Sequence, residues 1–141
     1  MKNNLEFFSA DNSTDIPLPF VEGIKAGFPS PAADYSDISI DLNRELIKHP
    51  SSTFYARVRG ESMRDAGIND GDLLVIDKSL EPTDGRIAVC YIDGEFTLKR
   101  IRIEGDGIYL YPANSEFSPI HVTEENEFVI WGILTHSIKS Y

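Results

Sequence analysis

Ser62 is the residue of this sequence whose surroundings best suit nucleophilic chemistry. It lies in the segment Gly60-Glu61-Ser62-Met63, where a strand pattern gives way to a single helical turn that runs to Gly67. A serine at a strand-to-helix corner has an exposed hydroxyl, and unpaired backbone N–H groups beside it suit an oxyanion hole. The alternative is that Ser62 only caps the helical turn, and these residues taken alone favour capping.

Lys99 is the candidate general base. It falls in the strand pattern from Phe96 to Ile103, whose two-residue period places Lys99 on the same side as Ile101 and Ile103. A charged amine on an apolar face is costly, so burial should lower its pKa, and a neutral amine can take a proton from a serine hydroxyl. The alternative is that the lysine stem lies on the sheet while the amine reaches water, and for Lys99 alone this is favoured.

No other group of side chains makes a better site. His49, His121 and His136 have neither metal-ligand spacing nor a cysteine pair beside them. Nothing local connects any of them to Ser62 in a Ser-His-Asp triad. Cys90 is the single cysteine, and its apolar strand pattern is typical of a packed thiol. Because phosphate-cradling glycine motifs are also absent, the sequence predicts neither a metal nor a cofactor.

The formal net charge of −10 disfavours direct nucleic-acid binding. Proteins that grip phosphates usually gather lysine and arginine, whereas here 13 basic residues are scattered among 23 acidic ones. A local basic patch stays open as an alternative, with the members Arg57, Arg59, Lys99, Arg100 and Arg102. We therefore expect protein partners and no direct sequence-specific DNA binding.

Membrane association is not expected either. No apolar run approaches the roughly 20 residues that span a bilayer. The first six residues lack the apolar stretch of a signal peptide. The expected location is therefore cytoplasmic.

The chain divides into two regions that differ in composition and hydrophobic periodicity. Residues 1–35 carry four prolines and show no sustained period of 2 or 3.6, so we expect a flexible, extended N-terminal arm. Residues 36–141 are expected to form a compact, mostly β domain of short twisted strands with one or two short helices. The clearest helix would run from Asp41, as its N-cap, to His49, and Pro50 would end it.

From Thr53 onward short apolar runs alternate with turns. Asp93-Gly94 is a strong hairpin signal between two of these runs. The last run is long, and we expect it to be either an exposed interface edge or a strand covered within the monomer. The expected strands are 54–58, 72–77, 86–92, 95–103, 108–111, 120–122 and 128–138.

Three segments together resemble the LexA/UmuD family of self-processing Ser–Lys peptidases, and the likeness runs from about Gly27 to His136. Each segment alone is weak evidence, but the order and spacing of the three are specific. Together they favour catalytic roles for Ser62 and Lys99 over capping and solvent exposure. The three segments are Ala26-Gly27-Phe28-Pro29-Ser30-Pro31-Ala32-Ala33-Asp34-Tyr35, Gly60-Glu61-Ser62-Met63 and Asp93-Gly94-Glu95-Phe96-Thr97-Leu98-Lys99.

The resemblance implies a β-rich peptidase that cuts its own chain between Ala26 and Gly27. Ser62 would attack the carbonyl carbon of Ala26, and Lys99 would accept the hydroxyl proton and pass it to the amine of Gly27. The backbone N–H groups of Ser62 and Glu61 would hold the oxyanion. In the family, a RecA filament on single-stranded DNA favours the cleavage-competent state.

The UmuD branch of the family fits best, because the residues before Gly27 are too few and too rich in proline for a helix-turn-helix domain. This branch implies a homodimer that, once trimmed, serves a UmuC-type translesion DNA polymerase in SOS mutagenesis. A catalytically silent β-rich binding module that regulates a polymerase or a RecA filament is the main alternative. A signal peptidase, which normally needs a membrane anchor, and a DNA-binding repressor are less favoured.

Overall fold

The computed structural model describes residues 5–10, 18–19 and 39–141. By their contacts, residues 1–10 and 49–141 form one compact unit, and residues 11–48 form another. In the second unit, β2 (Leu18–Pro19) pairs antiparallel with β3 (Ser39–Ile40), and helix α1 (Leu42–Leu46) follows. Within the described ranges, no helix has the length and apolar character needed to cross a bilayer.

Helix α1 is shorter than the sequence predicts. The predicted cap is confirmed, because the Asp41 carboxylate accepts a hydrogen bond of 3.0 Å from the backbone N–H of Asn43. The helix ends at Leu46, since Ile47 already has an extended backbone at φ −111° and ψ 104°. Pro50 then begins a separate 3₁₀ helix, η2 (Pro50–Ser52). Proline disfavours the helical conformation in the residue before it, which explains why the two helices do not merge.

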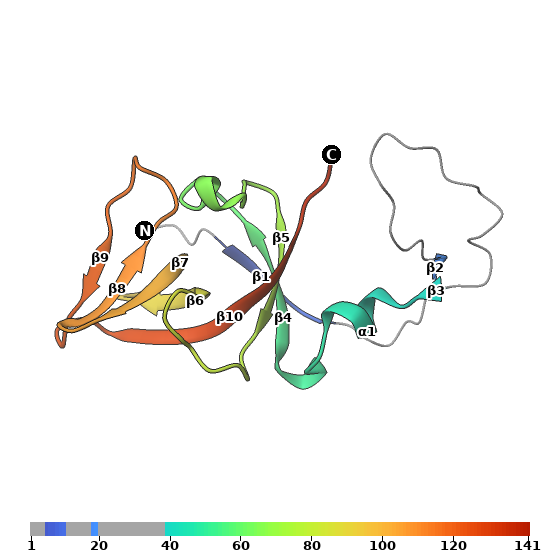
Figure 1. Ribbon diagram of the computed structural model, residues 1–141, viewed down its shortest axis with the longest axis horizontal. Coiled ribbons are helices and arrows are strands. Elements are labelled where there is room, and N and C mark those ends of the chain that lie inside the picture. The colour runs from blue at the N-terminus through green and yellow to red at the C-terminus, as the bar shows by residue number, and fades with distance from the viewer. Residues whose placement is uncertain (1–4, 11–17, 20–38) are drawn as a thin grey trace. The chain divides into compact units, whose positions relative to one another are not determined.

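The first unit is a single antiparallel sheet of eight strands in the order β1-β4-β5-β10-β6-β7-β8-β9 (Figure 1). The predicted mostly β fold is therefore confirmed, and every strand expected after Thr53 is present. A second 3₁₀ helix, η3 (Arg64–Ala66), lies between β4 and β5. The strands are β1 (Leu5–Ser9), β4 (Thr53–Val58), β5 (Leu73–Asp77), β6 (Ile87–Ile92), β7 (Glu95–Glu104), β8 (Gly107–Tyr111), β9 (Ile120–Val122) and β10 (Phe128–Ile138).

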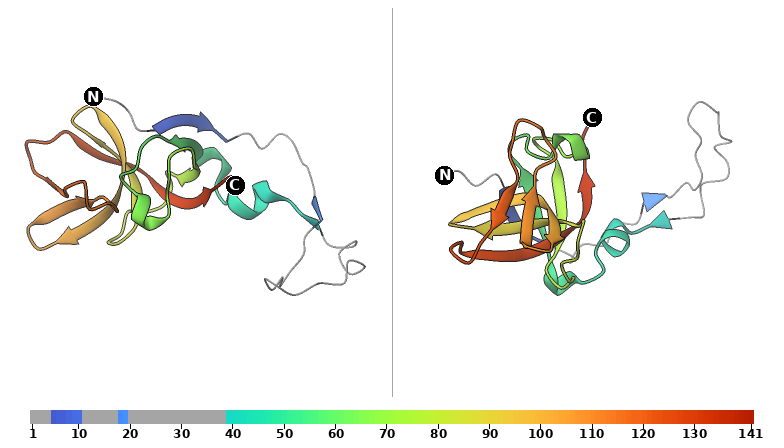
Figure 2. Two further views of the ribbon diagram at one scale, coloured as in Figure 1. Left: turned by 90° about the horizontal axis from the view of Figure 1, so that it is seen from above. Right: turned by 60° about the vertical axis from the view of Figure 1, so that its left-hand side comes forward.

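Strand β10 joins the two halves of the sheet. Its first half pairs with β6 and its second half with β5, with irregular register after Ile130 and after Leu134. Figures 1 and 2 show how the sheet curls along this long strand. Of the two alternatives for the last strand, coverage within the monomer is the one observed, because β10 has a neighbour on each side.

Strand β1 lies in the segment for which the sequence predicts an extended arm, and it was not predicted as a strand. Its five residues pair antiparallel with β4, from Leu5 opposite Val58 to Ser9 opposite Phe54. Leu5 is buried, and Phe8 is exposed on the outer side. Residues 5–9 therefore form the outermost strand on one side of the sheet, next to the strand that leads to Ser62.

Two apolar clusters lie on opposite faces of the curled sheet. Val89 belongs to the first and its neighbour Cys90 to the second, as the alternation of β6 requires. Cys90 is fully buried, as the sequence predicts, and burial raises the pKa of its thiol to about 12. The thiol is therefore neutral at ordinary pH and packs as an apolar group.

Gly132 should tolerate no side chain. It lies in β10 where a Cβ would come within 2.5 Å of the Ile76 side chain, close to the bulge that follows Ile130. Gly132→Ala should lower the free energy of unfolding by about 1–3 kcal/mol, because a packed core must shift to admit the methyl group. Urea unfolding measures this, and Gly105→Ala is the matched control, since a Cβ there meets nothing within 4 Å. Equal stability of the two variants would contradict this packing.

Candidate active site

Ser62 and Lys99 meet in the structure, although they come from distant parts of the chain. The Lys99 Nζ lies 3.4 Å from the Ser62 Oγ. Ser62 lies in the turn between β4 and η3, whereas Lys99 lies in the middle of β7. Within the described residues, Lys99 is the only hydrogen-bond partner of the Ser62 side chain.

The turn that carries Ser62 is held at both ends. At its start, Gly60 has a φ of +101°, which glycine adopts without strain, and its N–H donates to the Asp70 carboxylate at 2.8 Å. At its end, Met63 is buried, and its Sδ accepts a hydrogen bond from the Ala113 N–H at 3.3 Å. The N-cap of η3 is Met63 and no side chain caps it, so Ser62 does not have the capping role that the sequence alone favoured.

A buried asparagine from another loop braces the same turn. Asn114 donates its amide to the carbonyl of Glu61 at 2.7 Å, and its oxygen accepts from Arg64 at 3.3 Å and from the Glu116 N–H at 3.0 Å. The Asp65 N–H also donates to the Ala113 carbonyl at 2.6 Å. Nothing in the sequence distinguishes Asn114 as a residue of the site, because an asparagine in a loop is typical of an ordinary turn.

The backbone N–H groups of Glu61 and Ser62 have no hydrogen-bond acceptor among the described residues. The carbonyl of Glu61, by contrast, accepts from both Asn114 and the Arg64 N–H. Two free donors beside a serine hydroxyl are the arrangement that can stabilise an oxyanion. The oxyanion role that the sequence assigns to these two groups stays a prediction.

Lys99 is buried, with 6% of its surface exposed. Its amine donates to the Thr97 hydroxyl at 2.5 Å and to the Leu98 carbonyl at 3.3 Å. The alternative of a lysine whose stem lies on the sheet while its amine reaches water is therefore not observed. Burial lowers the pKa of Lys99, and this effect outweighs the opposite influence of Cys90 and Glu95. On the same face Ile101 is fully buried, but Ile103, near the end of β7, is 53% exposed.

A small pocket lies beside the hydroxyl of Ser62. Its walls are mainly apolar, and one of them is the Leu5 side chain of β1. Together with Ser62, the lining residues are Leu5, Val58, Arg59, Gly60, Met63 and Leu98.

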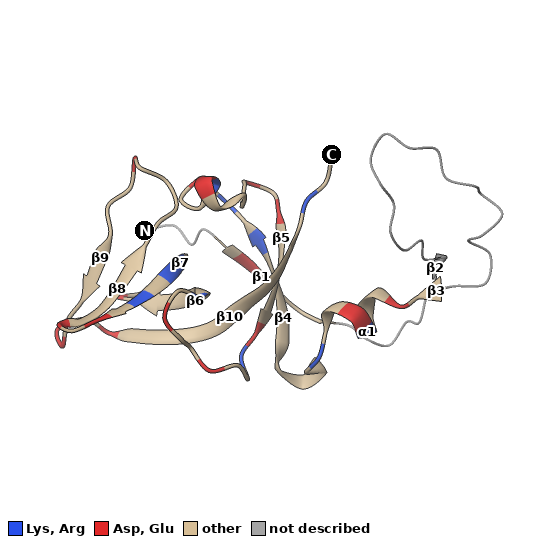
Figure 3. Ribbon diagram, viewed as in Figure 1, with Lys and Arg blue, Asp and Glu red and all other residues tan. Residues whose placement is uncertain are grey.

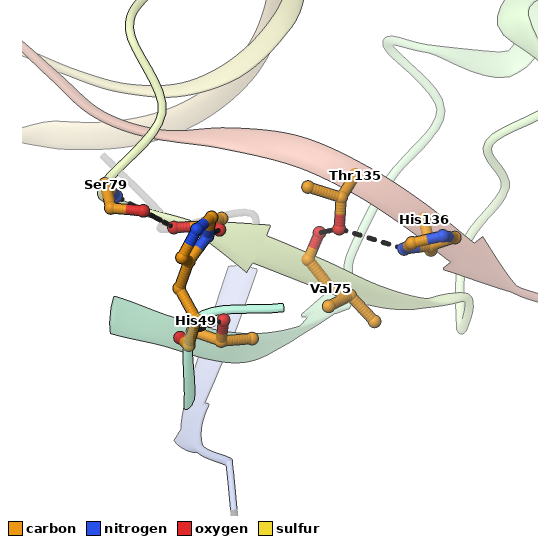
Figure 4. A network of polar contacts seen from close by, with 7 residues as sticks. His49, Val75, Ser79, Thr135 and His136 are labelled. Carbon is orange, nitrogen blue, oxygen red and sulfur yellow. Dashed lines mark hydrogen bonds and ion pairs between the residues drawn. The ribbon is translucent and has the colours of Figure 1, made fainter. Parts of the chain in front are cut away.

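None of the three histidines hydrogen-bonds to Ser62 in the described part of the chain. The His49 Nδ1 lies 2.6 Å from the Asp77 carboxylate, which also accepts from the Ser79 hydroxyl, and His136 contacts Thr135 (Figure 4). His121 stacks on Tyr109 with a centroid distance of 4.3 Å. A histidine-based triad at Ser62 therefore has no support in this geometry.

Of the five members of the local basic patch that the sequence left open, Arg102 is exposed on β7. Lys99 is buried, and Arg59 forms an ion pair of 2.8 Å with Glu6. Arg57 and Arg100 each donate to a glycine carbonyl, those of Gly71 and Gly85. Figure 3 shows basic residues on β7, whereas the acidic residues lie mainly in turns and near strand ends.

The expected cleavage site, Ala26–Gly27, lies outside the described residues. Its distance from Ser62 therefore stays open, and its assignment rests on the sequence.

Comparisons with known proteins point the same way as the geometry. A family model, Peptidase S24-like, matches residues 19–135. Protein MucA of Escherichia coli is 42% identical over 134 residues, which cover 94% of this chain and 91% of MucA. Protein ImpA of Shigella flexneri is 43% identical over 131 residues, covering 92% and 88%. The LexA repressor of Colwellia psychrerythraea is 38% identical over 124 residues, covering 87% of this chain and 58% of the repressor.

Proposed function

Because this chain belongs to the Peptidase S24-like family, as its likeness to the LexA/UmuD peptidases predicted, we propose that it is a serine peptidase that cuts its own Ala26–Gly27 bond. Ser62 is the nucleophile and Lys99 the general base. The observation that carries this proposal is the distance of 3.4 Å between the Lys99 amine and the Ser62 hydroxyl, with the amine buried.

The hydrogen bonds of Lys99 suit a neutral amine in this role. A neutral amine has two N–H groups and one lone pair, and the Thr97 hydroxyl and the Leu98 carbonyl can accept from the two N–H groups. The lone pair is then left for the hydroxyl proton of Ser62. Burial lowers the pKa of Lys99, so the fraction of molecules with a neutral amine is larger than for a lysine in water.

In the first half of the reaction, Lys99 takes the hydroxyl proton while the Ser62 Oγ attacks the carbonyl carbon of Ala26. The oxyanion is stabilised by the free N–H groups of Ser62 and Glu61. The Lys99 ammonium then protonates the departing amine of Gly27, and an ester joins Ala26 to Ser62. In the second half, Lys99 takes a proton from water, the hydroxide attacks the ester, and Ser62 recovers its proton.

Thr97 is a positioning residue for this base. Thr97→Val should slow cleavage by roughly 10–100-fold, because an amine that loses one acceptor no longer holds its lone pair toward Ser62. The hydroxyl also stabilises the charged amine, so its loss should move the rise of the pH–rate profile to lower pH. Cleavage rates measured between pH 6 and 11 test both effects. Thr97→Ser should restore the parent profile, and a valine variant with a parent profile would exclude this role.

In the cell, this reaction would convert the protein to a trimmed form that acts in SOS mutagenesis. We infer that a RecA filament on single-stranded DNA stimulates cleavage in the cytoplasm, and that the trimmed homodimer assists a UmuC-type translesion polymerase. The similarity to proteins MucA and ImpA over nine-tenths of the chain supports this assignment more directly than the similarity to the LexA repressor, of which the chain matches 58%.

The scissile bond can be tested with two glycines of the same arm. Gly27→Glu should block self-cleavage, because a charged side chain next to the bond would enter an apolar site. Gly23→Glu, three residues before Ala26, is the matched control and should cleave at a rate close to the parent. Cleavage of both variants at the parent rate would refute Ala26–Gly27 as the bond that is cut.

A further inference from the structure

The sheet contains one strand that cleavage would detach from the rest of the chain. β1 pairs with β4 along all five of its residues and is the outermost strand on that side. The chain connects β1 to His49 only through residues 10–48, and the Ala26–Gly27 bond lies in that stretch. After a cut at this bond, β1 would be held to β4 by non-covalent contacts alone.

Three side chains of β1 show which residue types the edge of β4 accommodates. Leu5 is 5% exposed and lines the small pocket beside Ser62. Glu6 forms the ion pair of 2.8 Å with Arg59. The Phe7 ring packs edge-on against Phe96 and Trp131, at centroid distances of 5.1 and 4.9 Å. The site thus recognises an apolar, an acidic and an aromatic residue in succession on an extended backbone.

We propose that cleavage releases β1 and that the vacated edge of β4 then binds an extended segment of a partner protein with the same apolar–acidic–aromatic order. This proposal rests on the proposed self-cleavage for its trigger, but the binding site itself depends only on the contacts of β1. The partner segment adds a strand to the sheet, so backbone hydrogen bonds hold it while Arg59 and the two apolar sites select its side chains.

Release of β1 follows from the change in effective concentration. While the chain is intact, the connection keeps β1 near β4 at an effective concentration of the order of millimolar. After cleavage the fragment must rebind from solution, so at protein concentrations below its dissociation constant β1 leaves most of the β4 edges empty. The edge that opens offers unpaired N–H and C=O groups together with an aromatic surface, which is a template for another strand.

A segment of another protein fits this edge better than a second copy of β4. β4 contains Arg57, and Arg59 follows it directly, so pairing with an identical edge would bring positive charges together once Glu6 has left. The released guanidinium of Arg59 instead favours an acidic residue, as Glu6 now provides. A partner strand with an acid between two apolar residues satisfies all three sites.

The test cuts the arm without using the active site. In the full chain with Ser62→Ala, the recognition sequence of a specific protease replaces residues 20–26, and added protease then severs the arm. A labelled peptide of residues 4–10 is the probe, and fluorescence anisotropy measures its binding. We expect binding to the cut protein at least tenfold tighter than to the uncut protein, and loss of the 1–26 fragment on gel filtration.

Two controls show whether the peptide binds at the β4 edge and not elsewhere. A peptide with Glu6→Arg should bind the cut protein at least about threefold more weakly, and an uncut chain with Leu5→Asp and Phe7→Asp should bind the parent peptide without any cut. Hydrogen exchange of the β4 amides should rise after cutting and fall again with peptide. The proposal would be overturned if the 1–26 fragment stayed bound, if the peptide bound cut and uncut protein equally, or if dimerisation protected β4 from exchange. None of these outcomes depends on the self-cleavage assay.

Discussion

Ser62→Ala should abolish cleavage between Ala26 and Gly27, lowering the rate by roughly 10³-fold or more, because the attacking oxygen is removed. The fold should be nearly unchanged. The Ser62 side chain is only half-buried, and the serine does not cap η3. Incubation of the purified protein at alkaline pH, followed by electrophoresis of the fragments, measures this rate.

Ser115→Ala is the matched control, since Ser115 is an exposed serine in the loop that braces the Ser62 turn. It should cleave at the parent rate. Cleavage of the Ser62 variant at more than about one-tenth of the parent rate would mean that another group is the nucleophile.

Lys99→Met should remove cleavage to a similar extent and also stabilise the fold at neutral pH. Methionine matches the length of the lysine stem but has no amine to accept the Ser62 proton. Burial lowers the pKa of Lys99 in the folded protein, so the folded state disfavours a charge that the unfolded chain carries freely. An uncharged side chain avoids this cost.

The sign of the pH dependence follows from proton binding. Between the lowered pKa of folded Lys99 and its ordinary value of 10.5, the unfolded chain binds a proton that the folded chain does not. The stability of the parent therefore rises with pH through this window, and its deficit relative to the methionine variant shrinks as pH approaches 10.5.

Thermal unfolding of parent and variant between pH 6 and 10 measures this difference. Lys48→Met is the control, because Lys48 is exposed and should shift the melting temperature little at any pH. A Lys99→Met variant that is less stable than the parent throughout this range, or that still cleaves, would contradict the role of a buried neutral base.

The strands between Thr53 and Ile138 were predictable because local signals define them. Asp93-Gly94 predicts a hairpin, and in the structure both residues have positive φ, 48° and 92°, between β6 and β7. The alternation of β7 likewise predicted the buried side for Lys99. The end of that pattern was wrong at Ile103, because the last three residues of β7 extend beyond the core and are exposed.

What the sequence did not reveal depends on partners far away in the chain. β1 is a strand because residues 5–9 pair with residues 54–58, and no period within the arm signals this. Asn114 braces the Ser62 turn from a distant loop. Thr97 lies two residues from Lys99 on the same strand face, and that spacing was the one signal that pointed to its contact with the amine.

The proposed chemistry is tested most directly by the mass of the fragments formed at a series of pH values. Mass spectrometry of the purified protein incubated between pH 7 and 10.5 should detect two fragments, residues 1–26 and 27–141. Their rate of appearance should rise with pH as Lys99 loses its proton, and both should be missing from Ser62→Ala and Lys99→Met. Fragments that end at another bond, or the same fragments from either variant at the parent rate, would contradict self-cleavage by Ser62 and Lys99.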